Sequence, residues 1–288
     1  MTVPEAFEGV AVRAGFALDD DYTLEHFKGG QEWRLRQGAR VLRWAPADGN
    51  AAPHIQRDAA MLAVLEHFHV PAPRLLNLDA AQADYVASVQ HLLLPDALRF
   101  DEDHEVHEST WVALGRYLRA LHASGITPRH TDAPGPRPLD VSLLDELEAA
   151  GRLTAVERRW LASWFRLLPQ APRLVPTHGV VQSTWIITDP SQSVVLGLTD
   201  WSLAGLREPG ADFLHLPDVA VPLVIQGYGS DGAGLLLVAR LRQWLDLSVM
   251  ADREVSTHDA GFREPGRLAA LLDGQLNLLG LTEQRGSF

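Results

Sequence analysis

The chain has 288 residues, of which 46% are hydrophobic and 22% are charged, with a formal net charge of −12 and no cysteine. This length is enough for one large domain or for two lobes with a sizeable core. The acidic balance argues against broad binding of nucleic acid or of anionic membranes, which needs a basic surface. The lack of cysteine excludes disulfides, thiolate catalysis and Cys-ligated zinc.

The N-terminal residues 1–21 contain no basic start followed by an apolar run, so we expect no signal peptide. The longest apolar stretch near the C-terminus, residues 232–239, is too short to span a bilayer and is followed by Arg240 and Arg242. We therefore expect a cytoplasmic protein without nucleic-acid or membrane partners. The sequence does not indicate an oligomeric state.

The first third of the chain is predicted to be rich in strands. Residues 22–46 alternate between apolar and polar side chains, with turn signals at Gly29-Gly30 and at Gln37-Gly38. Residues 54–68 instead place apolar side chains at 55, 59, 62 and 65, which predicts a helix that ends before the prolines of residues 70–73. Residues 84–94 predict another strand, and residues 95–100 a connector.

The rest of the chain is predicted to be mainly helical. Apolar side chains at 111, 114, 118 and 121 predict a helix from about Thr110, and further helices are expected at 141–150, 153–167, 232–249 and 265–279. Two short apolar segments around 185–199, separated by Asp189-Pro190-Ser191-Gln192, predict a β-hairpin. These patterns predict an α+β fold with an N-terminal lobe at 1–95 and a helical C-terminal lobe at 96–288.

Two motifs suggest sites that their details do not support. His104 and His107 in the acidic run of residues 101–108 are three residues apart, whereas a zinc-binding helix places two histidines four apart. The glycine-rich residues 227–234 lack the Gly-Lys-Ser/Thr ending of a phosphate-binding loop. We predict a solvated segment for the first motif and a loop for the second.

The most informative stretch is residues 177–188, T-H-G-V-V-Q-S-T-W-I-I-T, followed by L-T-D-W at 198–201. It resembles the catalytic core of the aminoglycoside phosphotransferase and choline kinase family, in which H-G-D-x-H-x-x-N precedes a hydrophobic-Asp-Trp/Phe segment. His178, Gly179 and Asp200 occupy the matching positions. Val180 stands where that family has its catalytic Asp, and Trp185 where it has its metal-binding Asn.

Other segments resemble the same family in the same order. Residues 26–33, H-F-K-G-G-Q-E-W, resemble its glycine-bearing hairpin over the nucleotide phosphates, which implicates Gly29 and Gly30. Residues 41–44, V-L-R-W, resemble the strand that carries the family's phosphate-contacting lysine or arginine, which makes Arg43 the candidate for that role. A guanidinium suits the role because it can donate two parallel hydrogen bonds to phosphate oxygens. The helix R-D-A-A-M-L-A-V-L at 57–65 has Asp58 where the family usually has the Glu that pairs with this cation.

The C-terminal half resembles the family as well. L-G-R-Y-L-R-A-L-H at 114–122 is similar to its L-G-x-x-L-A-x-L-H helix, and E-P-G-A-D-F-L at 208–214 to its D-P-A-x-D-L segment. The resemblance implies a bilobal protein-kinase-like fold. It further implies a metal-binding role for Asp200 and structural roles for His178 and Asp212.

The replaced residues determine what function the resemblance implies. Val180 cannot accept a proton, and Trp185 has no oxygen for magnesium, which prefers oxygen ligands. Gln182 could orient a hydroxyl group, but its amide is no useful base. We therefore expect a degenerate phosphotransferase, or pseudokinase, that binds ATP and Mg²⁺ weakly or not at all and accommodates a small molecule between its lobes. Two alternatives stay open: an active small-molecule hydroxyl kinase with an atypical site, and a non-catalytic binding or interaction protein on a kinase scaffold.

Overall fold

The structure is a computed structural model. It describes residues 4–18, 22–27, 32–79, 84–92, 98–99, 106–126, 142–151, 154–156, 158–159, 162, 174–217 and 219–229. The Gly29-Gly30 turn, the predicted helices at 232–249 and 265–279, and most of the one at 153–167 lie outside these residues. The predicted lobe boundary at residue 95 does so too, and the division into lobes stays a prediction.

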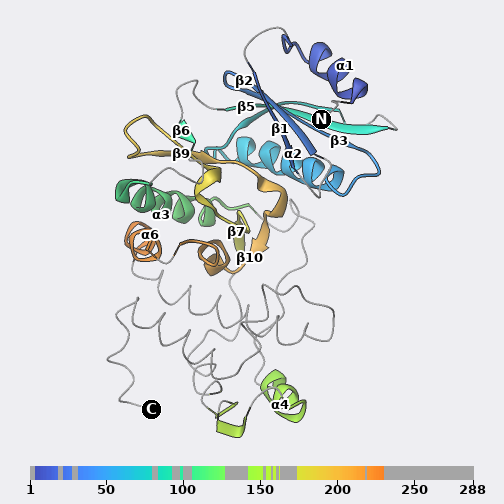
Figure 1. The fold of residues 1–288 in the computed structure, drawn as a ribbon. Helices are drawn as coiled ribbons and strands as arrows, with labels where there is room; N and C mark the ends of the chain where they lie inside the picture. The colour runs from blue at the N-terminus through green and yellow to red at the C-terminus, as the bar shows by residue number, and fades with distance from the viewer. Residues whose placement is uncertain are drawn as a thin grey trace.

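A five-stranded antiparallel sheet in the order β1-β2-β3-β5-β4 forms the first part of the fold (Figure 1). Its strands are β1 (Thr23–Phe27), β2 (Glu32–Gln37), β3 (Arg40–Pro46), β4 (Arg74–Asp79) and β5 (Tyr85–His91). The predicted strands at 22–46 and 84–94 are confirmed. The turn at Gln37-Gly38 is confirmed as well, since Gly38 has a φ of +56° and joins β2 to β3.

Two helices line the middle of the molecule, and both follow the predicted apolar stripes. Helix α2 (Ala52–His67) buries Ile55, Ala59, Leu62 and Leu65, each at most 1% exposed. Helix α3 (Glu108–His122) buries Trp111, Leu114, Leu118 and Leu121 in the same way. Side chains of both helices join one hydrophobic cluster with Val181, Ile186 and Trp201, so the sheet-bearing part and the later part share a core.

Short strands and 3₁₀ turns surround this shared core. The predicted hairpin is formed by β8 (Ile186–Thr188) and β9 (Val195–Leu198), which pair antiparallel. Strand β7 (Val175–Thr177) pairs with β10 (Gly205–Arg207). The 3₁₀ turns are η2 (Ser183–Trp185), η3 (Trp201–Leu203) and η4 (Pro209–Phe213), and helix α4 (Ser142–Ala149) agrees with the prediction for 141–150.

Several elements depart from the prediction. Helix α1 (Glu5–Arg13), which buries Phe7, Val10 and Ala11, was not predicted. Residues 95–100 were predicted as a connector but contain the two-residue strand β6 (Leu98–Arg99), which pairs with β8. Helix α6 (Val221–Tyr228) extends into the glycine-rich segment that was predicted to be a loop. Separately, no helix among the described residues is long and apolar enough to cross a membrane.

The extension of α6 has a packing reason. A β-carbon at Gly115 of α3 would lie 2.0 Å from the carbonyl oxygen of Val224, and one at Gly227 would lie 1.9 Å from that of Val112. The two helices therefore touch backbone to backbone at these glycines, which a larger side chain would prevent. Gly227 thus serves helix packing at this point rather than a loop.

Candidate active site

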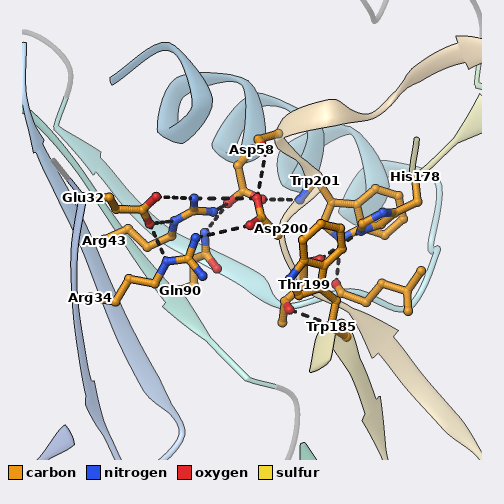
Figure 2. Close-up of polar contacts among 12 residues, drawn as sticks. Glu32, Arg34, Arg43, Asp58, Gln90, His178, Trp185, Thr199, Asp200 and Trp201 are labelled. Atoms are coloured by element: carbon orange, nitrogen blue, oxygen red, sulfur yellow. Dashed lines mark hydrogen bonds and ion pairs between the residues drawn. The ribbon is translucent and has the colours of Figure 1, made fainter. Parts of the chain in front are cut away.

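A buried network of charges lies where β2, β3, β5 and α2 approach the loop that follows β9 (Figure 2). Its centre is Arg43 on β3, whose side chain is 4% exposed. Arg43 Nε donates to Glu32 Oε1 at 2.7 Å and Nη2 to Glu32 Oε2 at 3.1 Å. Nη1 lies 2.9 Å from Asp58 Oδ2. Arg43 is thus held on two sides by carboxylates of this chain.

Asp58 connects the sheet to the loop after β9. Its side chain is fully buried, and Gln90 of β5 donates its amide to Oδ2. The main-chain N–H of Trp201 donates to Oδ1 at 2.6 Å. The pairing of Asp58 with Arg43 that the resemblance implied is present in the structure. A role of either residue in binding nucleotide stays a prediction.

Asp200 faces a second guanidinium as well as Arg43. Arg34 Nη2 donates to Asp200 Oδ2 at 3.2 Å, and Arg43 Nη2 lies 3.7 Å from Oδ1. Ser202 Oγ donates to Oδ1 at 2.9 Å. Asp200 itself has a φ of +64°, a left-handed conformation that is uncommon outside glycine. Both carboxylate oxygens are therefore engaged within the chain.

Arg34 and Arg43 stand directly opposite each other on β2 and β3. Like charges at opposed positions of a sheet repel, so this arrangement needs compensation. Glu32 supplies it, because its Oε1 accepts hydrogen bonds from the Nε atoms of both arginines. Among the described residues, the cluster brings together carboxylates from Glu32, Asp58 and Asp200 and guanidinium groups from Arg34 and Arg43.

The charges in this cluster stabilise one another. Burial raises the pKa of Glu32 and of Asp200, but the nearby charges of Arg43 and Arg34 outweigh it and hold each pKa below its ordinary value. Burial lowers the pKa of Arg43, and the charges of Asp58, Glu32 and Asp200 outweigh that effect and raise it. Glu32, Arg43 and Asp200 are therefore ionised at neutral pH.

His178 and Gly179 form the turn that leads into the altered catalytic loop. Both His178 ring nitrogens face main-chain carbonyl oxygens, Nδ1 that of Val180 and Nε2 that of Thr199 at 2.9 Å. The ring is fully buried and packs against Trp201 with a centroid separation of 4.6 Å. Because neither nitrogen points away from the backbone, His178 is placed to hold the loop rather than to serve as a base.

Asp212 fixes this turn from the other side. Its Oδ2 accepts from the His178 main-chain N–H at 3.0 Å, and its Oδ1 from that of Gly179 at 2.7 Å. His122 Nε2 lies 3.0 Å from Oδ2, and His122 Nδ1 lies 2.9 Å from the hydroxyl of Tyr228. Burial raises the pKa of Asp212, but its contacts with His122, His178 and Gly179 outweigh it and lower that pKa. These contacts fit the structural role expected of Asp212.

The substituted positions lie on the loop between β7 and β8. Val180 and Trp185 are half-buried, and Gln182 between them is exposed. The ring of Trp185 lies 5.7 Å from that of His178, and its carbonyl oxygen accepts the main-chain N–H of Thr199 at 2.9 Å. Asp189, the nearest carboxylate along the chain, accepts main-chain N–H groups of its own hairpin turn.

The donors around Asp200 do not fit a magnesium ion. Magnesium requires near-octahedral oxygen coordination at about 2.1 Å. Trp185 offers no oxygen from the predicted second ligand position, and both oxygens of Asp200 already accept hydrogen bonds from Arg34 and Ser202. Within the described part of the chain, no three His, Asp or Glu side chains are grouped so as to hold a metal ion.

Some members of the cluster were not predicted. Glu32 and Gln90 flank Arg43 only because of the strand register, and Arg34 looks like an ordinary surface cation on a strand. His122 ends a helix that was recognised, but its partner Asp212 lies 90 residues away. The candidate nucleotide-binding residues Gly29 and Gly30 are outside the described residues, so the structure does not locate them relative to Arg43.

The sheet, the helix beside it and the charged cluster between the sheet and the later loops define a protein-kinase-like fold. A family model, the phosphotransferase enzyme family, matches residues 29–232. The chain therefore belongs to the phosphotransferase enzyme family, as the motifs indicated. No curated protein sequence matches it.

Solved structures agree with this assignment at the level of the fold. The macrolide 2′-phosphotransferase of Brachybacterium faecium is 17% identical, with a TM-score of 0.57 over 90% of this chain and 96% of that one. The GDP complex of aminoglycoside 2′-phosphotransferase-IIIa is 14% identical, with a TM-score of 0.58 over 96% and 99%. A choline/ethanolamine kinase family protein from Mesorhizobium loti is 16% identical, with a TM-score of 0.56 over 96% of each chain.

Proposed function

We propose that this protein is a degenerate phosphotransferase, one that keeps the family fold but transfers phosphate weakly or not at all. The observation that carries the proposal is that a second carboxylate, that of Glu32, binds Arg43 in addition to the expected partner Asp58. The one arginine that the family motif assigns to phosphate is buried and bound to Glu32 and Asp58 of its own chain. The pairing with Asp58 is the one that the family uses, whereas a nucleotide that used this guanidinium would compete with Glu32.

The energetics of that competition are unfavourable. Displacing Glu32 from Arg43 would leave the nearly buried Glu32 carboxylate short of a partner, and loss of one partner from a buried ion pair costs about 3–5 kcal/mol. The carboxylates of Glu32 and Asp200 lie beside Arg43, so they repel a polyphosphate at the distance where Arg43 would have to contact it. Nucleotide affinity at this site is therefore weak.

The altered loop supports the loss of the chemical step. Phosphoryl transfer in kinases depends on metal ions that neutralise charge and on an Asp that orients the acceptor hydroxyl and takes its proton. General-base catalysis contributes roughly 10²- to 10⁴-fold, and Val180 contributes none of it. With Trp185 at the second metal-ligand position, both contributions are missing together.

An assay of nucleoside diphosphate release, which detects ADP or GDP, tests the proposal. The protein is incubated with ATP or GTP and magnesium, in turn with an aminoglycoside, a macrolide and choline as acceptors. Aminoglycoside 2′-phosphotransferase-IIIa serves as the positive control. We expect no acceptor-dependent release above that of the Asp200→Asn variant. Release that needs both an acceptor and Asp200 would instead establish the active kinase with an atypical site.

Thermal unfolding with nucleotide separates the remaining alternatives. The neighbour bound to GDP makes guanine as well as adenine nucleotides worth testing. A bound nucleotide at a hundredfold excess over its dissociation constant stabilises the folded state by about 2.7 kcal/mol. Stabilisation without turnover identifies a nucleotide-binding pseudokinase. No stabilisation by any nucleotide favours a non-catalytic binding protein on the kinase scaffold.

A further inference from the structure

Arg34 bridges two carboxylates that come from distant parts of the chain. Its Nε donates to Glu32 Oε1 on the same strand, and its Nη2 donates to Asp200 Oδ2 at 3.2 Å in the loop after β9. Figure 2 shows the Arg34 guanidinium beside both acids. Nε and Nη2 lie on one edge of the planar group, so a single cation faces both acids at once.

Arg43, the other arginine of the cluster, cannot alone balance the negative charges of Glu32 and Asp200. Arg43 forms its short contacts with Glu32 and Asp58, and it reaches Asp200 only at 3.7 Å. Without Arg34, Arg43 would face the carboxylates of Glu32, Asp58 and Asp200 alone among the described residues of the cluster. Glu32 and Asp200 are 8% and 15% exposed, so water would screen their repulsion only in part.

We propose that Arg34 is the resident cation of a two-carboxylate site formed by Glu32 and Asp200, and that it takes the place of a divalent metal ion there. A cation between two carboxylates is the arrangement that a bound divalent ion would otherwise create. An arginine keeps its charge at all accessible pH values and is attached to the chain, so it does not dissociate. The charge balance at Asp200 is then independent of metal supply. The inference goes beyond the proposed loss of transfer, because it concerns which cation balances Asp200.

Direct counting of bound manganese tests the inference on the unaltered protein. Mn²⁺ serves as the probe because it prefers the same oxygen ligands as Mg²⁺ and its free ion is quantified by electron paramagnetic resonance. No nucleotide or acceptor is added, so the result is separate from the turnover assay. We expect the native protein and the Asp200→Asn variant to bind the same number of Mn²⁺ ions. One additional ion on the native protein, absent from Asp200→Asn, would overturn the proposal.

Removal of Arg34 gives the complementary test. We expect the Arg34→Ala variant to bind one more Mn²⁺ ion than the native protein does. The double variant Arg34→Ala/Asp200→Asn loses it again. Arg36→Ala is the matched control, because Arg36 lies on the same strand and is half-buried, and its Nε donates to the Gly38 carbonyl oxygen at 3.3 Å. A gain in bound Mn²⁺ no greater than the gain of the Arg36→Ala variant would overturn the proposal.

A conservative variant covers the case in which Arg34→Ala does not fold. Arg34→Lys keeps one positive charge on the same strand, so we expect it to bind no additional Mn²⁺. If Arg34→Lys gains the site, charge is not what excludes the metal, and the proposal fails. Thermal unfolding with and without 1 mM Mn²⁺ provides a second measurement: Arg34→Ala is stabilised by the ion, and the native protein is not.

Discussion

Gly179 and Leu203 approach so closely that a β-carbon on Gly179 would lie 2.2 Å from the Leu203 carbonyl oxygen. Gly179 also has a φ of +97°, which disfavours other residues. We therefore expect Gly179→Ala to destabilise the fold by about 3 kcal/mol through overpacking and backbone strain. Urea unfolding monitored by tryptophan fluorescence measures this.

Gly38→Ala is the matched control for that variant. Gly38 also has a positive φ, of +56°, but a β-carbon there meets no atom within 4 Å. The Gly38→Ala variant therefore isolates the loss of stability that comes from the left-handed backbone alone, which is about 1 kcal/mol. If the two variants lose equal stability, the contact between Gly179 and Leu203 does not restrain the turn.

Removal of the Asp58 carboxylate tests the central ion pair. Asp58→Ala leaves Arg43 short of one partner and deprives the Trp201 N–H and the Gln90 amide of their acceptor. We expect a loss of about 3–5 kcal/mol in the free energy of unfolding, since a buried charge is left unpaired. Asp48→Ala, at an exposed position, should change stability by no more than about 0.5 kcal/mol. A similar small change for Asp58→Ala would contradict the buried network.

Acid should weaken the charged cluster in a defined direction. Glu32 and Asp200 have folded-state pKa values below their ordinary values of 4.5 and 3.8. The stability that they contribute is therefore complete above those ordinary values and is lost as the pH falls through the lower folded-state values. Each such group changes the free energy of unfolding by up to about 1.4 kcal/mol per pH unit in that interval.

Unfolding measured between pH 6 and pH 3 checks this dependence. In the Asp200→Asn variant, the slope of the free energy of unfolding against pH should be smaller below pH 4, by up to the contribution of one proton. Between pH 5 and pH 6, native and variant slopes should agree. An unchanged acid slope would show that Asp200 is not held in its charged form by Arg43 and Arg34.

Asp212→Asn tests how the turn at His178-Gly179 is held. The Asp212 carboxylate accepts the N–H groups of His178 and Gly179 on different oxygens, whereas an asparagine would present an amide NH₂ group to one of those donors. We expect a loss of about 2–4 kcal/mol, since at least one buried donor is left unsatisfied. Asp189→Asn, which alters a solvent-exposed turn, should cost less. Equal losses would argue against a special role for Asp212.

The sequence predicted those elements whose signal is local. The apolar stripes of α2 and α3 reflect one buried face each, whereas β3 and β5 are buried along almost their whole length. Strand β4 was not predicted because it lies at the sheet edge with exposed side chains, including Leu76 and Leu78. Strand β6 has only two residues and depends on pairing with β8, which no local pattern reveals.

The motifs predicted which residues lie together, the contacts that depend on strand register were missed, and the functional roles of these residues stay predictions. Arg43 and Asp58 pair as the resemblance implied, and Asp200 lies beside them although it is far along the chain. Arg34 and Glu32 were missed because their meaning comes from the alignment of β2 with β3 and from the loop after β9. Long-range electrostatic pairing of this kind leaves no periodicity in a sequence.

The attachment of the His178-Gly179 turn to Asp212 has a consequence for protein engineering. Asp212 holds the turn through the main-chain N–H groups of His178 and Gly179. Val180 and Trp185, which depart from the family motif, are half-buried and take part in the hydrogen bonds of the loop through their main-chain carbonyl groups rather than their side chains. The frame of the loop and its reactive positions are thus separable modules. Carboxylate or amide side chains can be introduced at 180 and 185 without rebuilding the turn, which makes this chain a scaffold for installing reactivity stepwise.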